Sequence, residues 1–375
     1  MLRVLRNLTV NLMAVFIRDR DARHKFRNKY KRKSKFRKLR DDNKRLFNEN
    51  KILQNDIIKI KSELAILKER YSQHLFEEQR LYTLTYHVEP LDNQAPLYPE
   101  SEVYLAIACV AKNEGQYIKE WIEYHKIVGV ERFYFYDNES DDNTKSILEP
   151  YIKEGTVVYH FLPNHKVSKK VPQIEAYNDA IFKYRDNTRW MAIIDIDEFI
   201  VPVEKETVTE FLTDYENYPG VVINWVMFDC NGHDTKPKEH GGLVTANYIR
   251  TSKNLNNYAQ NKIAKSIVNP KLVVQYISNH YGLYYLNFEA VTENFQKTRG
   301  VTTKLHSSNK IRINHYYTKS REEYTNKLIK HRQGNQSTSG YKFNEELLNF
   351  SGGTTEDLII QKYVPKLKRV LGVRD

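Results

Sequence analysis

Cysteine is almost absent from this sequence of 375 residues, which contains Cys109 and Cys230 and no others. One pair in so long a chain provides no disulfide framework, so the small disulfide-stabilised secreted domains are excluded and a reducing compartment is favoured. Hydrophobic residues make up 40% of the chain and aromatic residues 12%, which is enough for a sizeable core and argues against wholesale disorder.

The apolar segment 1–17 is too short for a membrane-spanning helix, which needs roughly 20 residues, and it contains Arg6. It also lacks a small-residue cleavage site, so a secretory signal is not expected. Its leucines recur on one helical face, which predicts an amphipathic helix lying on a membrane surface. The alternative is a solvated arm or a helix that binds a partner protein.

Acidic residues are scarce in the first forty positions, which hold fifteen Lys and Arg against two Asp. This arm therefore accounts for the net charge of +12, and the rest of the chain is nearly neutral. A basic arm favours contact with an anionic membrane surface. We expect a cytoplasmic, bacterial protein that associates peripherally with the inner face of the membrane.

Neither Pro nor Gly occurs between residues 18 and 89, so a long helix is expected there. Aliphatic residues recur every seventh position within it, at Leu39, Leu46, Leu53, Ile60 and Leu67. This pattern predicts that 18–78 is a basic segment followed by a two-stranded parallel coiled coil, and thus a homodimer. A helix that packs on its own domain is the alternative.

A basic segment followed by a leucine repeat also resembles transcription factors of the basic-zipper type. The segment 23–40 carries charge suited to phosphate but no evident set of base-reading side chains. A nucleic-acid-binding zipper protein is therefore only a rival hypothesis, and we expect no nucleic-acid partner.

Prolines at 90, 96 and 99 mark a linker over 79–102. Apolar strand-like runs then alternate with amphipathic helical patterns across 103–320. Alternation of this kind predicts an α/β domain with a mainly parallel sheet and helices on both faces. We expect 321–375 to form a C-terminal helical extension.

Polar clusters follow the ends of the expected strands at 112–114, 137–140 and 195–197. Each alone could cap a turn, but ligands of such sheets gather beyond the carboxyl ends of the strands. Asp195 and Asp197 stand two apart, so their carboxylates can point the same way and share one hard cation. Mg²⁺ or Mn²⁺, bound together with donor phosphates, fits this pair.

Several segments, in this order and spacing, resemble glycosyltransferases of the family 2 and family 92 type. They are Ala106–Glu114, Glu120–His125, Gly129–Thr144, Ile194–Ile200, Asn224–Phe228 with Gly232 and His233, Lys265–Pro270 and Ile313–Ser320. The resemblance covers roughly 104–330 and implies the Rossmann-like fold called GT-A.

The resemblance also implies roles for single residues. Those expected to bind the nucleotide-sugar donor are Ala111, Asn113, Glu114, Asp137, Gln173 and Asp195. Those expected to hold the metal are Asp195, Asp197 and His315. For His315 the alternative is a core histidine bonded to a backbone carbonyl.

The expected reaction is metal-assisted transfer of a sugar from a nucleotide-sugar donor, and a UDP-sugar is the expected donor. The acceptor would be a saccharide or a lipid-linked molecule in oligosaccharide or surface polysaccharide synthesis. An inverting enzyme also needs a base, and spacing selects none among Asp229, Asp234, Glu239 and Glu289. A scaffold that kept the transferase fold but lost activity is a further alternative.

Overall fold

The computed structural model describes residues 45, 47–49, 52–63, 103–163, 172–285, 288–334 and 343–374. The chain divides into two compact units, Met1–Glu77 and Glu78–Asp375, and each is taken here by itself. Within the described ranges, none of the helices combines the length and the apolar character needed to cross a membrane.

In the first unit, residues 52–63 are helical, as expected for the leucine repeat. Leu53, Ile57 and Ile60 are all more than half exposed on this helix. The other repeat positions, the amphipathic helix expected at 1–17, the basic arm and the linker at 79–102 lie outside the described residues. The coiled coil and the homodimer therefore stay predictions.

The second unit begins with the strands and helices that the sequence predicts. They are β1 (Val103–Ala111), α4 (Gly115–Ile127), β2 (Arg132–Asp137), α5 (Thr144–Glu154), β3 (Val157–Phe161), α6 (Pro172–Tyr184) and β4 (Thr188–Ile193). Next come β5 (Glu198–Pro202), α7 (Val208–Leu212), β6 (Gly220–Met227), α8 (Val244–Asn247), β7 (Arg250–Ser252), β8 (Ala264–Val268), β9 (Val273–Tyr276), β10 (Gly282–Tyr284), β11 (Val291–Thr292) and β12 (Ile311–His315). The predicted alternation of strand and helix up to β4 is confirmed.

Among the described residues, nine strands form the main sheet in the order β3-β2-β1-β4-β8-β6-β12-β5, with β11 beside β6. The pairs among β1 to β4 are parallel, and so are β6–β12 and β6–β11. The pairs β4–β8, β6–β8 and β5–β12 are antiparallel. The sheet is thus mixed α/β and mainly parallel, as predicted.

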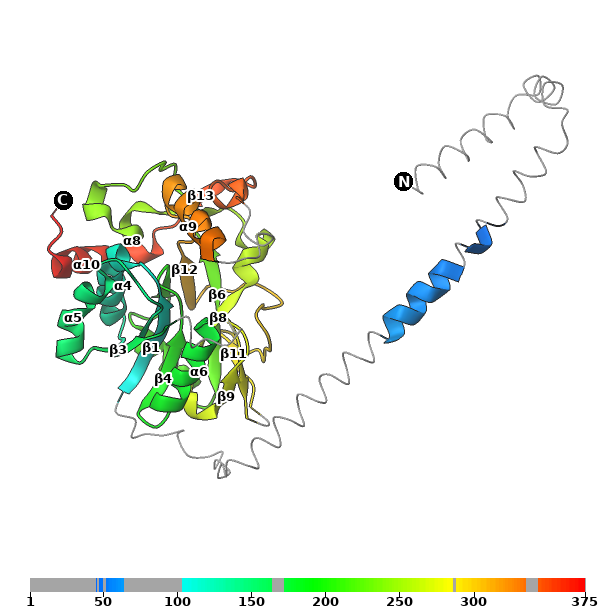
Figure 1. Ribbon diagram of the computed structural model, residues 1–375, viewed down its shortest axis with the longest axis horizontal. Helices are drawn as coiled ribbons and strands as arrows, with labels where there is room; N and C mark the ends of the chain where they lie inside the picture. Colours follow the sequence, from blue (N-terminus) through cyan, green and yellow to red (C-terminus); the bar gives the residue numbers. More distant parts are fainter. Residues whose placement is uncertain are drawn as a thin grey trace, which may run out of the picture. The chain divides into compact units, whose positions relative to one another are not determined.

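Helices cover both faces of the parallel part of this sheet (Figure 1). On one face Leu105, Ile107 and Cys109 of β1 belong to the larger core cluster with α4 and α5. On the other face Ala106 and Ala108 of the same strand pack with α6. This alternation is the period of two that a strand imposes, and the two alanines leave room for α6 to lie close.

Helix α4 holds the chain just beyond the end of β4 through three buried side chains. Trp121 Nε1 donates to the carbonyl oxygen of Glu198 at 2.8 Å, and Tyr124 Oη donates to that of Ile200 at 3.0 Å. The backbone N–H of Ile200 donates to Nε2 of His125 at 3.2 Å. Tyr124 and His125 follow Trp121 by three and four positions and so lie beside it on the helix surface. Helix α4 therefore fixes the start of β5.

The segment 321–375, expected to be a helical extension, contains α9 (Arg321–Gly334), β13 (Thr354–Glu356) and α10 (Val364–Leu371) in its described part. β13 pairs with β7. α10 packs on α4, and Asp357 binds the buried guanidinium of Arg312 on β12. These residues belong to the body of the second unit.

His125 gives the fold a calculable sensitivity to acid. Burial lowers the pKa of its imidazole from 6.5 to about 3, so the folded protein keeps it neutral while the unfolded chain protonates near pH 6.5. Its stabilising contribution is complete above pH 6.5 and is lost as the pH falls below that value. Between pH 7 and pH 5 the loss is about 2 kcal/mol, at 1.36 kcal/mol per pH unit.

We therefore predict that His125→Gln, which keeps an acceptor but cannot titrate, flattens the pH dependence of the unfolding free energy by about 2 kcal/mol over this range. Urea unfolding of both proteins at pH 5 and pH 7 measures this difference. An equal change in unfolding free energy between pH 5 and pH 7 for the variant and the wild type would show that His125 does not cause the pH dependence.

Candidate active site

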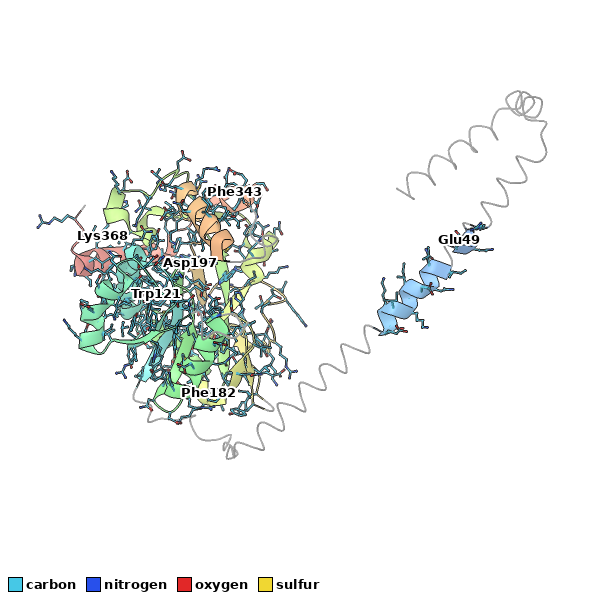
Figure 2. All side chains as sticks on the ribbon, viewed as in Figure 1. Glu49, Trp121, Phe182, Asp197, Phe343 and Lys368 are labelled. Carbon is cyan, nitrogen blue, oxygen red and sulfur yellow. The ribbon has the colours of Figure 1, made fainter. Side chains whose placement is uncertain are left out.

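One edge of the sheet gathers the polar strand ends. Ala111 at the end of β1 is paired with Asp137 at the end of β2, and β4 runs parallel to β1 and leads into Asp195. His315 ends β12 opposite Glu198, the first residue of β5. Asp197, labelled in Figure 2, directly precedes that strand and is half-buried. The structure thus brings the clusters beyond β1, β2 and β4 together with His315.

The loops after β1 and β2 bind each other. Ser140 Oγ accepts from the backbone N–H of Asn113 at 2.9 Å, and Asn113 Oδ1 accepts from the backbone N–H of Asp141 at 2.8 Å. Asn113 and Glu139 both adopt left-handed backbone conformations, each with φ of 58°. Such conformations are uncommon outside glycine and often lie at ligand sites.

Asp137 helps to build these loops. Its Oδ1 accepts from the backbone N–H of Ser140 at 2.9 Å and its Oδ2 accepts from Tyr159 Oη at 2.7 Å, and the residue is 2% exposed. Ala111, also buried, accepts at its carbonyl from the backbone N–H of Asn138. Both residues were predicted to bind the nucleotide-sugar donor, and in the structure both form hydrogen bonds that shape the loop.

Asp195 receives hydrogen bonds from three side chains. Gln173 Nε2 and Tyr177 Oη, both on α6, donate to its Oδ1 at 3.2 and 3.1 Å. Lys265 Nζ donates to its Oδ2 at 2.8 Å. Gln173 also accepts from Asn279 in the loop between β9 and β10. Gln173, which the resemblance placed among the residues expected to bind the nucleotide-sugar donor, thus orients Asp195.

Lys265 is 1% exposed and lies between two carboxylates, Asp195 at 2.8 Å and Glu198 at 3.6 Å. Burial alone would lower the pKa of its ammonium group, but the two carboxylates raise that pKa above its usual value. Burial raises the pKa of the Glu198 carboxyl well above its ordinary range, and Lys265 opposes this only in part. The lysine is therefore a fixed positive charge beneath Asp195.

Asp197 faces a different pair of groups. Lys327 Nζ on α9 lies 2.6 Å from its Oδ2, and His315 Nε2 lies 3.6 Å from its Oδ1. Burial alone would raise the pKa of this carboxyl, but Lys327 and then His315 outweigh it and hold the pKa well below its usual range. The Asp197 side chain is therefore ionised at neutral pH.

His315 is buried against the ring of Trp225, with ring centroids 4.2 Å apart. Burial lowers the pKa of its imidazole, which Asp197 offsets only in part, so the ring is neutral at pH 7. Its Nδ1 is buried and has no hydrogen-bond partner among the described residues. The alternative of a core histidine bonded to a backbone carbonyl through this nitrogen does not apply.

Asp197 and His315 have the chemistry of metal ligands, since one is an ionised carboxylate and the other a neutral imidazole. Two ligands of one ion with bonds near 2.1 Å stand about 3 Å apart, which a separation of 3.6 Å approaches. No group of three His, Cys, Asp or Glu suited to a metal occurs in the described ranges. Mg²⁺ and Mn²⁺ sites that include substrate phosphates need only one or two protein carboxylates, so the pair fits such an ion.

The four carboxylates considered as the catalytic base differ in burial and in their ion pairs. Asp229 is buried and binds Arg250 at 2.9 Å. Glu289 is held in ion pairs by two basic side chains that follow β11. Asp234 has a side chain that is 89% exposed and Glu239 is also exposed.

Sequence reasoning missed both lysines of the site. For Lys265 a signal existed, because a lysine inside the apolar strand run 264–268 must be paired when it is buried. For Lys327 the sequence gives no such signal, because α9 carries polar residues all around. Its contact with Asp197 depends entirely on how α9 packs.

Comparison with known proteins identifies a matching family model. The model described as glycosyltransferase family 92 matches residues 103–359, from the first strand of the sheet to the start of the segment before α10. All the site residues described above lie within this range.

Curated relatives share part of this region. A glycosyltransferase family 92 protein of Ricinus communis is 31% identical over 109 residues, which is 29% of this chain and 19% of the relative. The galactan beta-1,4-galactosyltransferase GALS3 of Arabidopsis thaliana is 32% identical over 109 residues, which is 28% of this chain and 21% of the relative. The chain thus matches about a fifth of the length of these relatives.

Among solved structures, S. aureus TarS in complex with UDP is 16% identical and covers 45% of this chain and 47% of that one. Its TM-score of 0.29 is too low for the likeness to support any argument about the site.

The charge balance at Lys265 can be tested by stability. We predict that Lys265→Met costs about 3–5 kcal/mol of unfolding free energy, because it leaves the carboxylate of Asp195 and the buried carboxyl group of Glu198 without their cation. The matched control is Lys183→Met, which removes an exposed i,i+4 pair with Asp179 and is expected to cost less than about 0.5 kcal/mol. Urea unfolding measures both, and equal small losses would refute the role of Lys265.

Proposed function

Because the chain belongs to glycosyltransferase family 92, we propose that it transfers a sugar from a nucleotide-sugar donor to an acceptor hydroxyl. The observation that supports this proposal is the direction of the strands, because the segments with Asn113, Asp195 and Asp197 follow strands that end at the same edge of the sheet as β12 with His315. A GT-A arrangement, with the donor beyond the carboxyl ends of the strands, fits the parallel half of the sheet.

In this proposal the loop 111–115 receives the nucleoside of the donor. Asn113 and Glu114 contact the base and ribose, while Ala111 and Asp137 hold the loop in shape. Asp195, oriented by Gln173 and Lys265, accepts from the hydroxyls of the donor. We propose a UDP-sugar, and UDP-galactose is the first donor to test, because GALS3 is named a galactosyltransferase.

Asp197 and His315 would hold Mn²⁺ or Mg²⁺ at the diphosphate. When bound, such an ion neutralises charge that develops on the departing diphosphate. Asp197 is kept ionised and His315 neutral by their surroundings, so both are ready to bind an ion without first losing a proton. Asp195 keeps its three present partners and completes the donor side of the site.

The N-terminal part suggests where the reaction takes place. The strongly basic segment 1–40 suits the inner, anionic face of a membrane, and the leucine repeat suits pairing of two chains. We propose a cytoplasmic, membrane-surface enzyme that elongates a saccharide or lipid-linked acceptor in surface polysaccharide synthesis. Binding to vesicles of anionic and neutral lipid would test the location separately from the chemistry.

The proposal predicts that Asp197→Asn lowers sugar transfer by about a hundredfold or more, as expected when a group that stabilises developing charge is lost. The readout is release of UDP from UDP-galactose and other UDP-sugars in the presence of Mn²⁺. The matched control is Asp214→Asn, because that carboxylate is 55% exposed and is only weakly paired with Lys205. The control should retain full activity, and circular dichroism checks that both variants fold.

Chelation gives a second test of the same proposal. We expect EDTA to abolish transfer and added Mn²⁺ to restore it. Full activity of the Asp197→Asn variant would show that Asp197 is not part of the active site. Full activity in EDTA would show that transfer does not need a divalent metal ion. A folded wild-type protein without turnover on a broad panel of donors and acceptors would favour the inactive-scaffold alternative.

A further inference from the structure

The two aspartates at the end of β4 each bind a lysine, but the two lysines are placed differently. Lys265 lies within the sheet, is 1% exposed on its side chain and bridges two carboxylates. Lys327 comes from helix α9, and its side chain is 26% exposed. The first is part of the sheet's interior, whereas the second reaches the site from its rim.

Lys327 Nζ binds the same carboxylate that would bind the metal ion, at the oxygen that faces away from His315. It is 2.6 Å from Asp197 Oδ2, and the other carboxylate oxygen lies 3.6 Å from His315 Nε2. An ammonium group and a divalent ion at one carboxylate share its single negative charge and repel each other, so each weakens the binding of the other. A metal ion at Asp197 must therefore overcome the contact of Lys327 with this carboxylate.

Lys327 has other partners that do not depend on Asp197. Its Nζ also donates to the carbonyl oxygen of Tyr317 at 3.3 Å and lies 3.8 Å from the centre of the Tyr317 ring. If the ammonium leaves the carboxylate, these two contacts can keep it partly satisfied at the rim. Displacement of Lys327 therefore does not leave a buried charge without a partner, which would be prohibitive.

The start of α9 is held firmly, so the position of Lys327 is built into the fold. Glu323 accepts from Tyr248 Oη at 3.0 Å and also from Tyr117 Oη. Its Oε2 accepts from the backbone N–H and Oγ of Ser320. Since Tyr117 lies on α4 and Tyr248 follows α8, these bonds tie the first turn of α9 to the rim. Lys327, one turn further on, is thus directed at the carboxylate.

We propose that Lys327 is a built-in counter-ion of Asp197 that competes with the divalent metal and so weakens metal binding to the free protein. This inference rests on the metal site proposed above and adds a specific residue to it. Lys327 acts here as a positioning and competing group, distinct from the metal ligands. Its removal should strengthen metal binding even where it impairs turnover.

The test measures binding of MnCl₂ alone, by isothermal titration calorimetry and by thermal unfolding of the full chain, without nucleotide or activity. For Lys327→Met we expect the apparent Kd for Mn²⁺ to fall at least tenfold, with a larger rise in Tm at a given Mn²⁺ concentration. Met keeps the length of the side chain while removing the charge. The double variant that combines Lys327→Met with Asp197→Asn should not show this increase in Mn²⁺ affinity.

Two controls separate competition from general effects. Lys327→Arg keeps a cation beside Asp197 and should bind Mn²⁺ within about twofold of wild type. Lys236→Met removes a positive charge that lies 4.6 Å from the Tyr117 ring and hydrogen-bonds to Gln116, so it should also leave the Kd near that of wild type. A merely structural role of Lys327 would not distinguish Met from Arg in this way.

Equal Mn²⁺ affinity of the Lys327→Met variant and the wild type overturns the inference and leaves the metal site intact. A gain of the same size in Lys236→Met overturns it as well, because the effect would then be general electrostatics. Absence of Mn²⁺ binding in every variant overturns this inference. Sugar transfer measured with and without EDTA then decides separately whether the proposed reaction occurs and whether it needs the metal.

Discussion

Three bonds from α4 to the first residues of β5 are the constraint on which the site depends. Trp121, Tyr124 and His125 are fully buried and satisfy backbone groups of Glu198 and Ile200. The same helix begins at Gly115, directly after the loop that carries Asn113. One rigid element therefore sets the distance between the proposed nucleoside loop and the turn that presents Asp195 and Asp197.

Within that frame the two aspartates are made unequal by what surrounds them. Asp195 is oriented by α6 and by a lysine locked within the sheet, so it is a fixed hydrogen-bond acceptor. Asp197 faces a neutral imidazole and a lysine supplied by a helix at the rim. Two aspartates two positions apart can thus bind one donor molecule in different ways, because the surroundings of each carboxylate determine its role.

Much of this arrangement is readable in the sequence, because local patterns determine it. Apolar runs of strand length alternate with helical patterns, and the elements through β4 follow from them. The motif at 194–200 marks the edge where ligands gather. The internal bonding of Asp137 and the approach of Lys327 are not readable, since each depends on a partner distant in the chain. The leucine repeat before residue 79 is evident in the sequence, while its pairing stays a prediction.

The place of β12 in the sheet has a consequence for how the protein matures. β5 joins the main sheet through β12, which itself lies beside β6, and β12 is translated long after both neighbours. Until the ribosome has released it, β5 has no strand to pair with, and the chain lacks His315 and Lys327. Because such distant pairings form slowly, the edge of the sheet that carries Asp197 and His315 can be completed only after β12 and α9 have joined the domain.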